Sequence, residues 1–263
     1  MLDLTERKRA EEHARQSELR YREVQAELAH ANRVATMGQL AASIAHEVNQ
    51  PIGATVANAH AAQRWLNARP PGMEQVQQAL GRIVKDGNRA SNVIGRIRDL
   101  IRKAPRCKEP VDIDAAIREV IELTQVEAMK RGATVEMQLA DGLPFIEGDR
   151  VELQQVLLNL IINSLEAMSS VDDGVRHLLI TTARADADAD TVLVTVRDSG
   201  PGFAAESIEN VFAPFYTTKP SGLGMGLSIC RSIIDAHGGQ LWASANVPRG
   251  AVVHFTVPAH PAD

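Results

Sequence analysis

Asn159-Leu-Ile-Ile-Asn163-Ser-Leu-Glu166-Ala167 is the stretch that decides the fold of this 263-residue chain. The surrounding residues 149–168 are mostly aliphatic, which predicts a buried helix. Asn159, Asn163 and Glu166 stand at i, i+4 and i+7, so they form one polar edge on that helix. Amide and carboxylate oxygens suit a Mg²⁺ ion that also bridges phosphates. The plainer alternative is a row of partnered polar residues at a surface.

Alternating apolar and polar residues on both sides of this helix predict a sheet. The expected strands are 134–139, 177–184, 191–197 and 252–257, with a turn at 186–190 and a further helix over 114–130. Helices and an antiparallel or mixed sheet of this size predict a two-layer α/β sandwich.

Asp198-Ser199-Gly200-Pro201-Gly202 follows one of these strands. An aspartate at a strand end can accept a hydrogen bond from a base amine, and the glycines let the backbone come close. Taken alone, the motif is equally typical of a plain loop.

Gly222-Leu-Gly224-Met-Gly226 stands just before a predicted helix, 227–237. Backbone amides there are free to bind phosphate oxygens. The spacing is neither that of the dinucleotide fingerprint nor that of a P-loop. Residues 215–222 are expected to form a lid over the ligand.

His46-Glu47-Val48-Asn49-Gln50-Pro51 forms a third motif, near the N-terminus. Leu40, Ile44 and Val48 define a buried stripe, so His46 should point to solvent. Glu47 is placed to orient or deprotonate the imidazole. Pro51 should bend the helix. A lone histidine is more often an ordinary surface residue.

Two further apolar patterns, with the stripe at Leu40, Ile44 and Val48, predict how the first hundred residues assemble. A thin heptad seam over 10–35 favours a two-stranded coiled coil over a single solvated helix. A stronger seam over 73–101 follows a Pro-Pro-Gly break in 68–72, which predicts an antiparallel helical hairpin. One hairpin leaves its seam half exposed, so two should pair as a four-helix bundle, which predicts a homodimer. Residues 104–110 read as a linker.

Composition excludes several classes of protein. The net charge of −5 argues against a nucleic-acid binder with a broad basic face. Only Cys107 and Cys230 occur, so neither a disulfide framework nor a cysteine zinc site is expected. No apolar stretch is long enough to span a bilayer. We expect a soluble, cytoplasmic protein.

The order of these motifs resembles the sensor histidine kinases of two-component systems. HEVNQP, NLIINSLEA, DSGPG, FAPF and GLGMGL match their H, N, first glycine, aromatic and second glycine boxes, and the chain looks closest to PAS-linked kinases of the FixL and NtrB kind. Residues 3–8 resemble the exit of a PAS domain. We therefore expect a C-terminal piece of a longer sensor, whose parent could be membrane-anchored.

The resemblance implies four regions and an ATP-binding domain of the GHKL type. They are a signalling coiled-coil helix (1–34), a dimerisation and phosphotransfer hairpin (35–104), a linker (105–110) and a catalytic ATP-binding domain (111–260). Expected partners are a second copy, bound through 1–104, and the receiver domain of a separate response regulator; no direct nucleic-acid contact is expected.

It also implies roles for individual residues, with ATP and Mg²⁺ as cofactors. His46 would accept the phosphoryl group, with Glu47 as base or orienting residue and Asn49 and Gln50 beside it. Asn163 would bind Mg²⁺ and Asp198 would read the adenine amine. The other ATP-site residues would be Asn159, Glu166, Gly200, Gly202, Phe215, Thr217, Thr218, Lys219, Gly222, Gly224 and Gly226, and Phe212 with Phe215 would seat the lid against the core.

Two other functions stay open at this stage. Related ATPases of the same fold carry a glutamate that activates water where this chain has Asn159, which disfavours a homodimeric ATPase because asparagine cannot act as a base. A phosphatase or scaffold is the second alternative. Related kinases position water with threonine or asparagine where Gln50 stands, and Asn49 could substitute for it.

Overall fold

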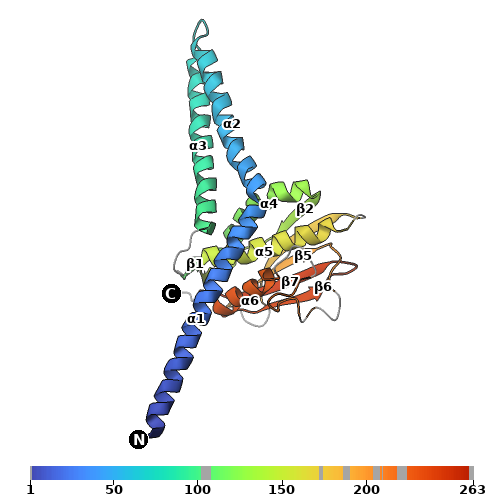
Figure 1. Cartoon of the computed structure of the whole chain (residues 1–263). Coiled ribbons are helices and arrows are strands. Elements are labelled where there is room, and N and C mark those ends of the chain that lie inside the picture. The colour runs from blue at the N-terminus through green and yellow to red at the C-terminus, as the bar shows by residue number, and fades with distance from the viewer. Residues whose placement is uncertain are drawn as a thin grey trace.

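The protein consists of a long helical part followed by an α/β sandwich (Figure 1). The computed structural model describes residues 2–101, 108–171, 174–185, 190–203, 208, 210–217 and 224–260. None of the helices found among these residues is both long and apolar enough to cross a membrane.

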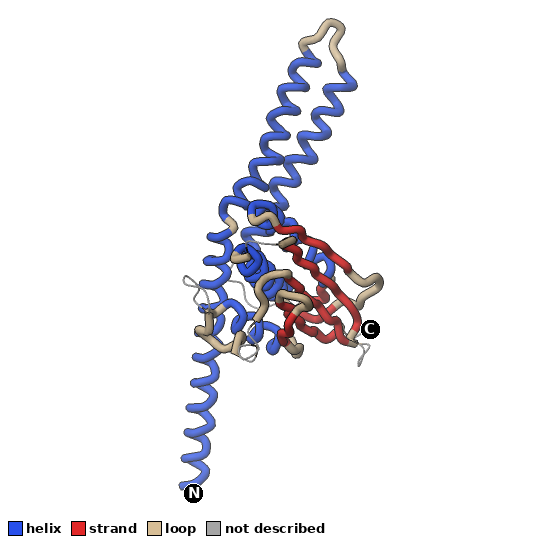
Figure 2. Tube along the Cα trace, turned by 90° about the vertical axis from the view of Figure 1, so that its right-hand side faces the viewer, coloured by secondary structure: helices blue, strands red, loops and turns tan. Residues whose placement is uncertain are grey.

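Three helices make up the first part: α1 (Leu2–Gln39), α2 (Ala41–Leu66) and α3 (Met73–Ile101). α2 and α3 pack side by side as the predicted antiparallel hairpin, which projects away from the sandwich (Figures 1 and 2). α2 continues as one helix through Pro51, and the break in the long N-terminal helix lies instead at Leu40. Leu40 is fully buried in a cluster that includes the sandwich core, so packing there fixes the break.

Small side chains form the inside of the hairpin. On α3, Ala79, Ala90 and Val93 are buried. Leu80 and Ile94, which belong to the predicted seam, are 51% and 52% exposed. Part of the predicted seam is therefore buried and part is exposed, because one neighbouring helix can cover only one side of α3.

The second part contains a five-stranded mixed sheet and a two-stranded ribbon. The strands are β1 (Glu109–Val111), β2 (Ala133–Gln138), β3 (Ile146–Gly148), β4 (Arg176–Arg184), β5 (Thr191–Asp198), β6 (Leu241–Ala245) and β7 (Ala251–Pro258). The sheet order is β2-β4-β5-β7-β6; β2 runs parallel to β4, the other neighbours are antiparallel, and β1 pairs with β3. The predicted mixed two-layer sandwich is confirmed.

Three helices pack on one face of this sheet (Figure 2): α4 (Ile113–Lys130), α5 (Arg150–Ser169) and α6 (Gly226–Ala236). Their predicted boundaries are confirmed to within one or two residues. Aspartate caps fix two of them, because Asp112 accepts a hydrogen bond from the amide of Ala115 and Asp149 accepts from the amides of Val151 and Glu152. α5 is buried along most of its length and forms the centre of the core.

Three short strands were not predicted. β1, β3 and β6 have three to five residues, too few for a clear alternation. β1 also corrects the predicted linker, because Glu109 and Pro110 pair with β3. Residues 104–107 of the predicted linker and most of the predicted turn, 186–189, lie outside the described residues.

Candidate nucleotide and phosphoacceptor sites

Asp198 is the last residue of β5 and the first residue of the first glycine motif. Its Oδ1 accepts hydrogen bonds from the amides of Gly200 (2.8 Å) and Ala251 (3.1 Å), and its side chain is almost completely buried. Burial raises the pKa of this carboxyl group, while the two backbone amides and the Ser164 hydroxyl oppose the rise. With Oδ1 held by the backbone, the second oxygen is available for a donor such as a base amine.

Gly202 is required where it stands. Its φ is +82°, and a Cβ there would lie 2.7 Å from the carbonyl oxygen of Gly250. The predicted close approach of backbone in this motif is therefore present. Gly250 was not singled out from the sequence, because the contact joins loops that are nearly fifty residues apart.

The polar edge of α5 meets the start of α6. The Nδ2 of Asn159 donates to the carbonyl of Gly226 (3.5 Å) and to Sγ of Cys230 (3.7 Å). A Cβ on Gly226 would lie 3.6 Å from Nδ2 of Asn163. Burial raises the pKa of the Cys230 thiol to about 12, so this thiol is a neutral packing group. The predicted polar edge thus faces the start of the helix that follows the second glycine motif.

This edge fits a magnesium ion held jointly with phosphates. Asn159, Asn163 and Glu166 offer neutral and acidic oxygens, which Mg²⁺ prefers as ligands. Within the described residues there is no cluster of three or more His, Cys, Asp or Glu that could hold a metal by itself. An ion here would therefore take water or phosphate oxygens for the rest of its coordination.

The second glycine motif is only partly described. Gly224 has φ +66°, and a Cβ there would lie 2.5 Å from the carbonyl carbon of Phe215. Thr217 is described and takes part in an interaction. Thr218, Lys219 and Gly222, which were predicted to line the triphosphate, lie outside the described residues.

The two phenylalanines of the aromatic motif differ. Phe212 is buried, and the guanidinium of Arg231 lies 4.6 Å from its ring centre. Phe215 is 72% exposed and has a positive φ of 66°. The prediction that Phe215 seats the lid against the core is therefore wrong; of these two phenylalanines only Phe212 reaches the core, while Phe215 points to solvent at a backbone position packed tightly against Gly224.

His46 lies on α2 and is exposed, as predicted. The amide nitrogen of Gln50 is 2.9 Å from its Nε2. When that amide donates, Nε2 is the acceptor and the ring proton lies on Nδ1. Glu47 is half-buried and has a partner, and Asn49 is exposed. In this tautomer the Nε2 lone pair is engaged by Gln50, so that amide has to move away before Nε2 can react with another group.

His237 is a positioning residue that the sequence motifs did not reveal. Its Nδ1 donates to the carbonyl of Ile233 (2.7 Å), and its Nε2 accepts from the amide of Asp149 (3.0 Å). The buried imidazole therefore ties the N-cap of α5 to the C-terminal end of α6. The only sequence signal was the His-Gly-Gly that ends the helix.

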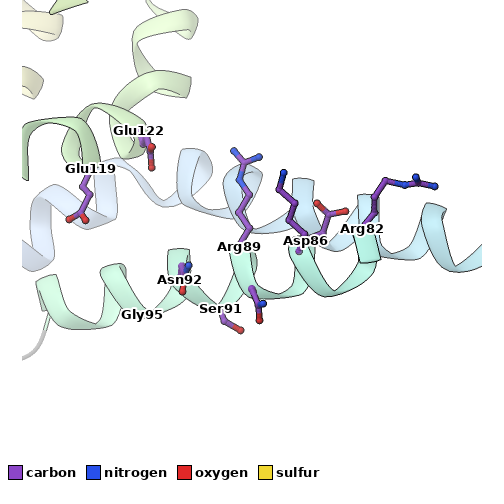
Figure 3. A pocket seen from close by; sticks show the side chains of 10 residues that line it. Arg82, Asp86, Arg89, Ser91, Asn92, Gly95, Glu119 and Glu122 are labelled. Carbon is purple, nitrogen blue, oxygen red and sulfur yellow. The ribbon is translucent and has the colours of Figure 1, made fainter. Parts of the chain in front are cut away.

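A groove of about 1010 Å³ lies between α3 and α4 (Figure 3). Arg82 and Arg89 line it from α3, and Glu119 and Glu122 from α4. Glu119 is already paired with Arg150 at 2.9 Å. None of the predicted nucleotide residues that the structure describes lines this groove, which is formed by α3 and α4.

The fold and these sites define the class: an ATP-binding α/β sandwich joined to a helical hairpin that carries an exposed histidine. Residues 36–105 match the model of the His Kinase A (phospho-acceptor) domain, and residues 148–261 match that of the Histidine kinase-, DNA gyrase B-, and HSP90-like ATPase. The catalytic domain of histidine kinase ThkA is 35% identical, with a TM-score of 0.51 over 59% of this chain and 99% of that one. The chain belongs to the sensor histidine kinase family.

Longer relatives cover nearly the whole chain. Sensor histidine kinase TmoS of Ectopseudomonas mendocina is 37% identical over 97% of this chain and 26% of its own length. Sensor protein FixL of Bradyrhizobium diazoefficiens is 39% identical over 93% of this chain and 48% of its own length. The chain thus spans half or less of these relatives. ThkA in complex with response regulator protein TrrA is 27% identical, with a TM-score of 0.51 over 88% of this chain and 64% of that one.

Proposed function

We propose that this chain transfers the γ-phosphoryl group of Mg-ATP to His46 and then to an aspartate of a separate response regulator. The observation that carries the proposal is the exposed position of the His46 imidazole on α2, in a chain that also contains the Asp198 pocket. The complex of ThkA with TrrA supports a response regulator as the partner.

In the proposed reaction, each site residue has a separate role. Asp198 accepts a hydrogen bond from the adenine amine. Asn163, with Asn159 and Glu166, would hold Mg²⁺, and this ion would offset the negative charge of the phosphates. Nε2 of His46 attacks the γ-phosphorus as its bond to the β,γ-bridging oxygen breaks, so ADP leaves. Glu47 takes the proton from Nδ1. Lys219 and the glycine motif hold the triphosphate.

The direct test is incubation with γ-labelled ATP and Mg²⁺, followed by acid and alkali. A phosphorus–nitrogen bond gives label that is lost in acid and stable in alkali. Label that is stable in acid and lost in alkali would place the phosphate on a serine or threonine hydroxyl, and label that is lost in both would place it on a carboxylate. Either result would contradict the proposal.

Dephosphorylation of the regulator is a second candidate function. The observation that favours it is the Gln50 amide, which lies within hydrogen-bond distance of the His46 ring and could hold a water there. We expect Gln50→Leu, which keeps the size but removes the amide, to slow dephosphorylation about tenfold through loss of one water-positioning hydrogen bond. The measurement is loss of label from receiver domains phosphorylated with acetyl phosphate. Asn49→Leu is the matched comparison, and a larger effect there would move the role to Asn49.

We also propose that the chain forms a homodimer through a four-helix bundle. Met73, Leu80 and Ile94 recur at seven-residue intervals or multiples of seven on α3 and are exposed, beside exposed Ile52 and Val56 on α2. These side chains would be covered by a second hairpin.

Lysine at two of these positions should weaken the dimer. We expect Leu80→Lys with Ile94→Lys to weaken self-association at least tenfold, because each buried charge would need to be paired or hydrated. Sedimentation equilibrium gives the dissociation constant. Gln78→Lys, on the opposite side of α3, is the control, and an equal effect of both changes would argue against this interface.

A further inference from the structure

One face of α1 packs against the polar edge of α5, where the proposed function places Mg-ATP. Nδ2 of Asn32 donates to Oδ1 of Asn159 at 3.2 Å. Oγ1 of Thr36 donates its one proton to the carbonyl of Asn32 at 2.9 Å and also lies 3.4 Å from the same oxygen of Asn159. One turn earlier on α5, Nη1 of Arg33 donates to Oε1 of Gln155 at 2.7 Å. In Figure 1, α1 crosses α5 and runs past α6.

The contact extends in both directions along α1. The Gln155 side chain donates back to the carbonyl of Ala29 (3.2 Å), and Nε2 of Gln39 donates to Oε1 of Glu166 (3.2 Å). Met37 and Leu40 are buried in the cluster that includes the sandwich core. The docked segment is therefore residues 29–40, held by both polar and apolar contacts.

The orientation of the Asn159 amide shows what this contact prevents. Its nitrogen faces α6, donating to Gly226 and Cys230, so its oxygen faces α1. The oxygen is the only atom of an asparagine side chain that can bind a cation. Asn32 donates to this oxygen, Thr36 lies against it, and the positive charge of Arg33 lies one turn away. Asn159, packed between α1 and α6, is only 5% exposed.

We propose that residues 29–40 of α1 compete with Mg-ATP for the polar edge of α5, so that docked α1 holds the ATP-binding domain in a state of low nucleotide affinity. This rests on the proposed function, because it assigns that edge to Mg-ATP. Undocking of α1 then becomes the step by which an upstream signal admits nucleotide.

Two features of α1 allow it to undock from α5. The helix breaks at Leu40, and Gly38 just before it has open space around its Cα. The heptad seam lies on a neighbouring face of α1, where Ala31 and Ala35 are exposed while the docked face is covered. α1 can therefore form a coiled coil whether it is docked on α5 or not. A rotation of that coiled coil would then change the contact between α1 and α5.

The test is nucleotide affinity in the full chain with the α1 donors removed. We expect Asn32→Ala combined with Thr36→Val to bind Mg-AMPPNP about tenfold more tightly by calorimetry, since less binding energy is spent on displacing α1. Val34→Ala is the matched control, because Val34 lies between the two positions but is exposed. It should leave the affinity unchanged.

A second readout follows from reciprocity. If α1 and nucleotide compete, saturating Mg-AMPPNP must also release α1, so amide hydrogen exchange in residues 29–40 should rise at least tenfold. An affinity of the double variant within twofold of the unchanged chain, or unchanged exchange in 29–40, would overturn the competition. If neither chain binds nucleotide, the proposed function itself fails, which is a different result.

Discussion

Replacing His46 by glutamine should abolish phosphate incorporation from γ-labelled ATP. Glutamine has a similar reach but no nucleophilic nitrogen, because its amide lone pair is delocalised into the carbonyl group. Since His46 is exposed on α2 and its ring contacts Gln50 on the same helix, the change should leave the fold intact. We expect at least a thousandfold loss of label, of the order seen when a nucleophile is removed from an enzyme.

Two measurements make this result specific. Mg-AMPPNP affinity should be the same in His46→Gln as in the unchanged chain, because His46 lies outside the nucleotide pocket. His60→Gln is the matched control, since His60 is also exposed on α2; it should retain full label. Label that survives in His46→Gln would refute the assignment of the phosphoacceptor. Sustained ATP hydrolysis by that variant would favour the ATPase alternative.

Asp198→Asn should lower nucleotide affinity about 100-fold. The asparagine oxygen can still accept from the amides of Gly200 and Ala251, so the loop keeps its shape. The new NH₂ group then faces the adenine amine, and two donors replace a donor–acceptor pair. A lost hydrogen bond to a charged group with an unsatisfied donor left behind corresponds to about 3 kcal/mol.

Calorimetry with Mg-ADP measures this change. Asp235→Asn is the control, because it removes the same charge from an exposed position on α6. Equal affinities for Asp198→Asn and the unchanged chain would show that the base is read elsewhere.

The titration of Asp198 should make the free energy of unfolding and the affinity for adenine nucleotide change with pH in opposite directions. Burial raises its pKa, so the native state holds this proton more tightly than the unfolded chain. Its contribution to the free energy of unfolding is present below the ordinary aspartate pKa, about 3.9, and is lost as pH rises through the raised pKa. Adenine binding needs the ionised form and should strengthen over the same range. Both dependences should be absent in Asp198→Asn.

Local patterns were sufficient for the elements that carry the chemistry. The aliphatic run around Asn159 and Asn163 predicts α5, and the Pro-Pro-Gly break predicts the hairpin, because helix formation and helix termination depend on residues within a few turns of each other. The exposure of His46 and the position of Asp198 at a strand end follow from the same local periodicities.

Other features depend on contacts between distant segments. The exposure of the Phe215 side chain and the packing of its backbone against Gly224 join two separate loop positions. Which residues of the α3 seam are buried depends on the side of α3 that α2 covers. The three-residue strand β1 exists because β3, more than thirty residues later, supplies its hydrogen bonds.

The sequence by itself determined the helices, most strands and the proposed residues of the nucleotide and phosphoacceptor sites, since each is specified by side chains close together in the chain. Only the tertiary structure decided that α1 lies on α5 and that the oxygen of Asn159 points at Asn32 and Thr36. These residues are more than 120 positions apart. No local periodicity specifies such a contact, because it forms only once the apolar side chains of Met37 and Leu40 have joined the buried core.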